Sequence, residues 1–206
     1  MTVLNRIAFF QHRRDEIPNV LLGRELAETE DRAGLDEIAA HLRDPNANVA
    51  SDCLKVLYEA GYLRPDLVAP YVEDFLALLT QRNNRLVWGA MIALGLIAPL
   101  QAERLFAERQ KIIEIMANGS VITVDNGIQV LAGIASTAEE YNGEIFPILL
   151  QHLRTCREKE IAQHGERISA AVNDANRAAF VEVLTARLPA LTESQAARVR
   201  KLIRKV

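Results

Sequence analysis

Apolar residues return along this chain at a fixed interval of 37 positions. One column holds Leu57, Leu94, Leu131 and Ile168, and a second holds Ile38, Phe75, Ile112 and Leu149. Because both columns keep the same step, one structural unit is repeated along the chain. Within a unit the apolar residues follow helical spacing, as in Val72, Phe75, Leu76 and Leu79. The pattern therefore predicts a stack of amphipathic helix pairs.

Each unit is predicted to contain a first helix, a short polar turn and a second helix. The expected pairs cover 35–43 and 48–60, 66–81 and 85–98, 102–117 and 122–136, and 144–155 and 158–172. The fifth unit is slightly shorter, and its second helix is predicted to start at a capping box formed by Thr192 and Gln195. Asn46 or Asn48 can cap the second helix of the first unit, and Asp66 the first helix of the next.

Residues 3–14 and 18–30 predict two further helices that fit the repeat poorly, as a terminal cap should. We therefore expect one domain over residues 1–206. Residues 1–32 would form an N-terminal helical cap, and residues 33–206 would form about five helix pairs of about 37 residues.

The second helices are predicted to be buried. Residues 86–102 carry no charge, but this run contains Pro99 and falls inside the repeat, so a buried inner helix explains it better than a membrane span. Another column contains the small residues Cys53, Ala90 and Gly127, which would let neighbouring helices approach closely. His164 occupies the same column and breaks its rule.

The segment from Leu86 to Ile97 reads Leu-Val-Trp-Gly-Ala-Met-Ile-Ala-Leu-Gly-Leu-Ile. It resembles the second helix of HEAT and HEAT-like (armadillo-type) repeats, and the resemblance extends over about residues 34–205. The resemblance implies an all-α fold, an α-α superhelix or HEAT-like solenoid whose second helices line the concave side. It also implies binding of partner proteins as the commonest function, while a minority of such proteins bind DNA and include DNA glycosylases.

Composition and charge exclude several other classes of protein. The formal net charge is −3 and the pI is near 5.9, so nothing attracts nucleic acid or an anionic membrane to the whole chain. Two cysteines make no disulfide framework. We expect a cytoplasmic protein with a protein or peptide partner, without nucleic acid or membrane as a ligand.

No catalytic motif is present, so we expect neither an enzyme nor a cofactor. His41 and His152 share one first-helix column and are interpreted as structural histidines, so no metal site is predicted. Glu160 and His164 are interpreted as an ordinary surface pair. The second cysteine, Cys156, is expected at a helix end.

The candidate binding residues are polar or aromatic positions that the core of the second helices does not need. We call them the second-helix stripe: Asp52, Lys55, Arg85, Trp88, Asp125, Asn126, Gln129 and Gln163. Trp88 is either a core residue or an anchor in the groove. Asp125 and Asn126 either face the groove or cap a helix that starts late.

Three functions are compatible with these features. The first is a non-enzymatic scaffold that holds a peptide or protein on the concave stripe. The second is a DNA-binding HEAT-like protein, such as an alkylbase glycosylase, with Trp88 stacking on a base and Asp125 stabilising a cationic sugar. The third is an accessory subunit of a homo- or hetero-oligomer, because the 24–37 segment is acidic and the last nine residues are basic.

Overall fold

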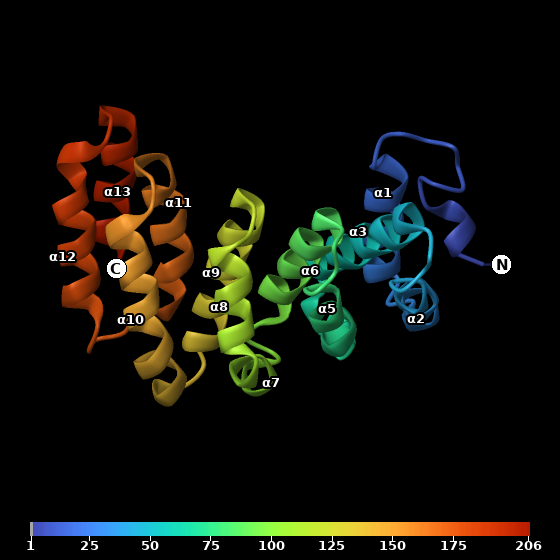
Figure 1. Ribbon diagram of the computed structural model, residues 1–206, viewed down its shortest axis with the longest axis horizontal. Helices are drawn as coiled ribbons and strands as arrows, with labels where there is room; N and C mark the ends of the chain where they lie inside the picture. The colour runs from blue at the N-terminus through green and yellow to red at the C-terminus, as the bar shows by residue number, and fades with distance from the viewer. Residues whose placement is uncertain (1) are drawn as a thin grey trace. The chain divides into compact units, whose positions relative to one another are not determined.

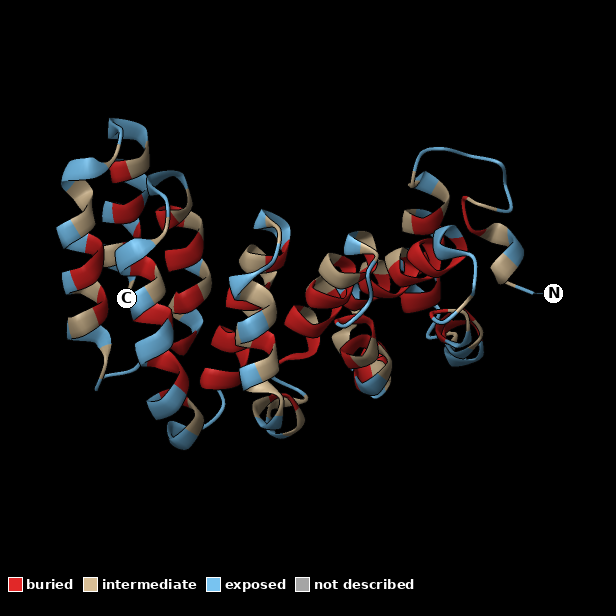
Figure 2. Ribbon diagram, viewed as in Figure 1, coloured by how far each residue is buried: buried red, intermediate tan, exposed pale blue. Residues whose placement is uncertain are grey.

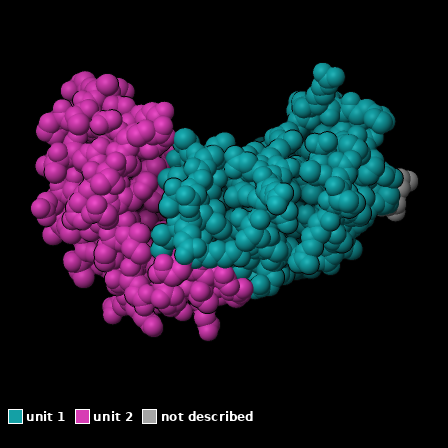
Figure 3. Space-filling view, in the orientation of Figure 1, with its two compact units in different colours: residues 1–101, 111–127 teal, residues 102–110, 128–206 magenta. Residues whose placement is uncertain are grey.

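The structure, a computed structural model, describes residues 2–206 and contains no strand among them (Figure 1). The chain forms two compact units (Figure 3). Unit 1 comprises residues Met1–Gln101 and Lys111–Gly127, and unit 2 comprises Ala102–Gln110 and Ile128–Val206. No helix among residues 2–206 is long and apolar enough to cross a membrane.

Unit 1 stacks the second helices side by side. Its elements are η1 (Leu4–Arg6), α1 (Ile17–Glu28), α2 (Arg32–Ala40), α3 (Ala47–Leu63), α4 (Pro65–Val68), η2 (Ala69–Tyr71), α5 (Val72–Leu78) and α6 (Asn84–Ile97), followed by most of α8 (Arg109–Ala117) and the start of α9 (Val121–Ala135). The second helices α3 and α6 pack on each other, and α1 packs along the other side of α3. The first helices α2 and α5 pack against α3 and α6, respectively.

Unit 2 repeats this arrangement. It contains α7 (Ala102–Ala107), the end of α9, α10 (Glu139–Thr155), α11 (Glu158–Ile168), η3 (Ser169–Ala171), α12 (Arg177–Arg187), η4 (Leu188–Ala190) and α13 (Glu193–Lys205). The first helices α10 and α12 pack together, as do the second helices α11 and α13. Each first helix also packs on its own second helix.

The predicted apolar columns form the core. The residues of the two 37-residue columns, from Ile38 and Leu57 to Leu149 and Ile168, are fully buried. Figure 2 shows buried positions along the facing sides of the helices and exposed positions on the outer sides and turns. Removing this apolar area from water stabilises the stack by about 25 cal/mol per Å².

Of the two helices predicted before the first unit, one is present and the other is not. α1 corresponds to the helix expected at 18–30, whereas only Leu4–Arg6 of the segment expected at 3–14 forms a short 3₁₀ helix. Side chains from elsewhere in unit 1 bind backbone N–H groups of this segment, at Val3, Ala8 and Phe9. These bonds replace the backbone pairing that a helix would have provided.

Two predicted first helices are interrupted. The range 66–81 divides into α4, η2 and α5, with Pro70 in the 3₁₀ turn between the two α-helices, and 102–117 divides at Glu108. The proposed cap Asp66 lies inside α4 and binds the Arg64 guanidinium, while Pro65 takes the first helical position.

The other predicted caps are confirmed. Asn46 accepts a hydrogen bond from the N–H of Asn48 at the start of α3. Thr192 and Gln195 form both hydrogen bonds of the capping box on α13.

Candidate functional site

Four residues of the second-helix stripe lie on α3 and α6 in unit 1: Asp52, Lys55, Arg85 and Trp88. Lys55 is half-buried on α3, and Arg85, Trp88 and Ile92 are half-buried one turn apart along α6. Trp88 is therefore neither a fully buried core residue nor a freely exposed one. Gly89, the next residue, faces α3 instead, because a Cβ there would lie 2.7 Å from Cδ2 of Leu54.

The chain's own N-terminal segment, residues 7–16, crosses the start of this stripe. The N–H of Phe9 donates to Oδ2 of Asp52 at 2.8 Å, and the N–H of Ala8 donates to Oδ1 of Asn19 at 2.8 Å. Asp52 is only 7% exposed. Its carboxylate therefore acts as an acceptor for a main-chain N–H and is not open to solvent.

Glu16, at the end of this segment, meets two cations of the stripe. It forms an ion pair with Arg85, and its Oε2 lies 3.6 Å from Nζ of Lys55. Nζ of Lys55 also lies 2.6 Å from Oε1 of Glu59 and 4.7 Å from the centre of the Tyr58 ring. Burial opposes ionisation of Lys55, but these hydrogen bonds and charges raise its pKa above the ordinary value, so it stays cationic.

A cavity of about 270 Å³ lies where the segment meets the stripe. It is lined by Ala8, Phe9, Arg13, Arg14, Asp15, Glu16, Asn48, Asp52 and Arg85. Its wall contains both signs of charge, and Asp52 and Arg85 come from the predicted stripe. The structure thus brings these two residues and Lys55 to one site, together with an N-terminal segment that the sequence analysis had not placed there.

The stripe residues of α9 are also half-buried. Nδ2 of Asn126 donates to the carbonyl of Ile122 at 2.8 Å, which is a local bond within the helix. Asp125 and Gln129 are half-buried as well. Asp125 and Asn126 belong to unit 1, whereas Gln129 and the half-buried Gln163 belong to unit 2.

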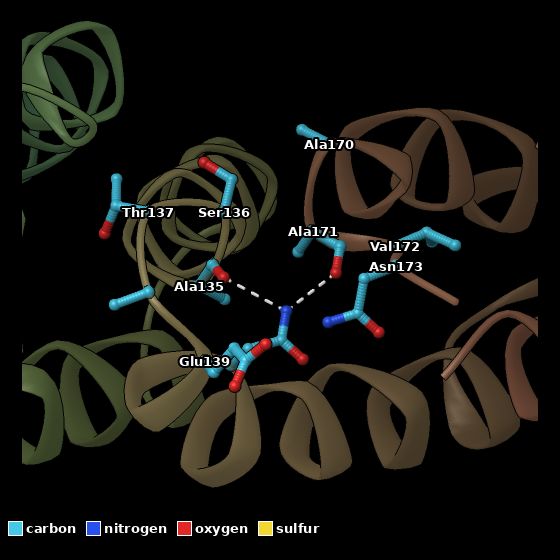
Figure 4. A pocket seen from close by; sticks show the side chains of 10 residues that line it. Ala135, Ser136, Thr137, Glu139, Ala170, Ala171, Val172 and Asn173 are labelled. Carbon is cyan, nitrogen blue, oxygen red and sulfur yellow. Dashed lines mark hydrogen bonds between the residues drawn. The ribbon is translucent and has the colours of Figure 1, made fainter. Parts of the chain in front are cut away.

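Unit 2 has a separate small cavity of about 240 Å³ between the end of α9, the start of α10 and η3. Figure 4 shows the amide that spans it. Nδ2 of Asn142 donates to the carbonyls of Ala135 and Ala171, at 3.0 and 2.7 Å, and its Oδ1 accepts from Asn176. The amide uses its donors and acceptor to join three segments of unit 2, which indicates a structural role.

A cluster of histidine and cysteine in unit 2 was missed by the sequence analysis. Nε2 of His152 lies 2.9 Å from Nδ1 of His164, and the ligand atoms of these two residues and Cys156 all lie within 4.8 Å of one another. The signal was present, because Cys156 follows His152 by four positions. The interpretation of His164 and Glu160 as a surface pair is wrong: His164 is fully buried, and Glu160 pairs with Arg157.

The two cysteines lie where the sequence predicted. Cys53 is fully buried in the column of small residues, and burial raises the pKa of its thiol to about 12. Cys156 caps the end of α10, and burial raises its pKa to about 11, although Arg187 opposes the shift. Both are therefore neutral thiols near pH 7 unless something else binds the thiolate.

No family model and no curated protein matches the chain. Among solved structures, a designed armadillo repeat protein in complex with the peptide (KR)4 matches with a TM-score of 0.68 at 14% identity, over 90% of each chain. Computationally designed armadillo repeat proteins for modular peptide recognition match with a TM-score of 0.68 at 14% identity, over 94% of each chain. An engineered protein matches with a TM-score of 0.65 at 17% identity, over 100% of this chain and 98% of the other. The chain therefore has the all-α helical-repeat fold of the armadillo and HEAT-like class.

Proposed function

We propose that this protein is a non-enzymatic scaffold that holds a segment of a peptide or protein partner on the second helices of unit 1. The observation that carries the proposal is the seating of the chain's own residues 7–16 there. A non-helical segment is already held by side chains of α3 and α6, through its backbone at Asp52 and through an acidic side chain at Arg85.

Each of these contacts has a separate role in recognition. A carboxylate that accepts a main-chain N–H binds any sequence, because every residue except proline offers that donor. Arg85 and Lys55 add selectivity for an acidic side chain, as they do for Glu16. Trp88 and Ile92 supply apolar area beside Arg85, and buried tryptophan and arginine are typical anchors of binding energy.

The partner would lie beside the N-terminal segment or replace it, and would continue toward Asp125 and Asn126. Gln129 and Gln163 belong to unit 2 and are proposed as binding residues of that unit. Designed proteins of this fold support peptide recognition as a use of the fold, since one is in complex with a (KR)4 peptide. Here Arg85 and Lys55 favour an acidic residue in the partner, as they do Glu16, and Asp125 favours a basic residue elsewhere in it.

Charge reversal tests this surface in the full-length protein. Tagged wild-type, Arg85→Glu and Asp125→Lys proteins are expressed in the native host, and co-purifying proteins are quantified by mass spectrometry. Arg43→Glu is the matched control, because Arg43 is exposed on the first-helix side, where it pairs with Asp74. We expect both stripe variants to lose at least about 90% of a partner that Arg43→Glu retains, since a charge pair at an interface contributes about 1.5 kcal/mol or more.

Circular dichroism must show unchanged helix content in all three variants. Retention of every partner by Arg85→Glu and Asp125→Lys would exclude this surface. Equal loss in Arg43→Glu would show that binding follows net charge and not the stripe.

A further inference from the structure

His164 is an exception in its own structural column. The equivalent positions in the preceding repeats hold Cys53, Ala90 and Gly127, all small, and the imidazole of His164 is fully buried. Burying a polar ring is costly unless it is paired. The pairing group is His152, whose Nε2 lies 2.9 Å from Nδ1 of His164.

A third ligand atom lies on the same side of this pair. His152 and Cys156 are separated by four positions at the end of α10, so their side chains project from one face of the helix. His164 comes from α11, which packs against α10. The two imidazoles and the thiol keep all their ligand atoms within 4.8 Å of one another.

We propose that His152, Cys156 and His164 form a binding site for Zn²⁺ or a chemically similar divalent transition-metal ion. Two imidazole nitrogens and a thiolate sulfur are the ligands such borderline ions prefer. The site has three protein ligands, and water takes the fourth tetrahedral position.

The geometry requires only small adjustments. Bond lengths of about 2.1 Å to nitrogen and 2.3 Å to sulfur place tetrahedral ligand atoms about 3.3–3.7 Å apart. The two nitrogens must therefore separate by about 0.4 Å from their hydrogen-bonded distance of 2.9 Å, and the sulfur, which lies within 4.8 Å of both, must approach by up to about 1 Å. Rotation of the Cys156 side chain, at a helix end, provides the second movement.

The charges around the cluster also fit a cation. A divalent ion bound to one thiolate has a net charge of +1. The nearby negative group is the carboxylate of Glu160, which interacts electrostatically with both Cys156 and His164. Arg157 pairs with Glu160. Arg187 donates to the backbone carbonyl of Cys156 at 2.7 Å and so holds the end of α10 beside the cluster.

Cobalt titration of the reduced, chelator-treated full-length protein tests the site. We expect one Co²⁺ per chain, with the intense visible bands of four-coordinate cobalt and a near-ultraviolet thiolate-to-cobalt charge-transfer band. Zn²⁺ should abolish both signals by displacement and should raise the Tm of the wild-type protein.

Two cysteine variants provide the matched comparison. Cys156→Ser should lose the charge-transfer band and bind Zn²⁺ at least about tenfold more weakly. Cys53→Ala should keep both, because Ala90 fills the same column in the next repeat. His152→Gln should weaken binding while Cys156 remains intact.

Three results would overturn the proposal: no four-coordinate cobalt spectrum at micromolar metal, the wild-type spectrum in Cys156→Ser, or equal loss of the band in Cys53→Ala. Because Cys156 is half-buried at a helix end, circular dichroism of Cys156→Ser should match the wild type. A loss of the band with intact helix content therefore reports on metal ligation.

Discussion

Substitution of Gly23 by alanine tests the close packing of α1 on α3. A Cβ at Gly23 would lie 2.5 Å from the carbonyl oxygen of Val56, 2.8 Å from Cβ of Glu59 and 3.1 Å from the backbone nitrogen of Ala60. Two of these three atoms belong to the backbone of α3, so no side-chain rotation can relieve the contact. The two helices must therefore move apart. This affects the proposed binding surface, because α1 holds the N-terminal segment beside it.

The expected magnitude follows from two opposing effects. Overpacking a well-packed contact costs about 1–3 kcal/mol. Replacing glycine by alanine inside a helix contributes about 1 kcal/mol in the other direction. We therefore expect Gly23→Ala to lower the free energy of unfolding by up to about 2 kcal/mol.

Gly143→Ala is the matched control, because a Cβ there meets nothing within 4 Å. Gly143→Ala should therefore raise the free energy of unfolding by about 1 kcal/mol, because alanine favours the helix more than glycine does and no contact opposes it. Urea unfolding followed by circular dichroism measures both variants, with the shift in midpoint compared at unchanged slope. A midpoint for Gly23→Ala that rises as far as that of Gly143→Ala would refute the close contact between α1 and α3.

Three further predictions concern the N-terminal segment, the Cys156 thiol and the bridging amide. Asp52→Ala removes the carboxylate that accepts the Phe9 N–H, a charged hydrogen bond that contributes about 1.5–3 kcal/mol. Trypsin should therefore cleave within residues 7–16 at least about tenfold faster than in the wild type. An unchanged cleavage rate would contradict the contact. Burial raises the pKa of Cys156 to about 11, so in metal-free protein its alkylation by iodoacetamide should keep rising above about pH 8.5, where the thiol of free cysteine is half-ionised. A plateau near that pH would show an ordinary thiol. Asn142→Ala removes the side-chain donor of the Ala135 carbonyl and the acceptor that the Asn176 amide uses, so urea unfolding of unit 2 should show a loss of about 1–3 kcal/mol. Wild-type stability would refute a bridging role.

The core and most helix ends could be predicted because their causes are local and repeated. The columns of Leu57 and Phe75 are buried as the 37-residue period requires. Asn46 and the Thr192–Gln195 pair cap their helices through bonds that span two or three residues. Such features need no knowledge of the rest of the chain.

The seating of residues 7–16 could not be predicted, because its hydrogen bonds cross long stretches of sequence. Ala8 binds a side chain 11 positions away, and Phe9 binds one 43 positions away. The segment containing Ile7, Phe9 and Phe10 was therefore predicted to be a helix, but tertiary hydrogen bonds hold it in another conformation. The eight stripe residues were chosen by column. The structure brings Lys55 and Arg85 together through Glu16, and Asp52 binds the same N-terminal segment through the N–H of Phe9.

The histidine cluster lies between these two cases. The spacing of His152 and Cys156 is visible in the sequence, and His164 is visible as the exception in a column of small residues. The three side chains meet because α11 packs against α10. The 37-residue period predicts that these helices pack together, but it does not predict which side-chain atoms come into contact.

Site-specific photo-crosslinking tests the central claim, that the second helices of unit 1 hold a partner, most directly. A photoreactive phenylalanine analogue is placed at Trp88 in the full-length protein, with Glu73, exposed on first helix α5, as the control position. We predict a discrete adduct with a partner segment at position 88, which Arg85→Glu abolishes, and no such adduct at position 73. The absence of an adduct at 88, or the same adduct at both positions, would contradict the account.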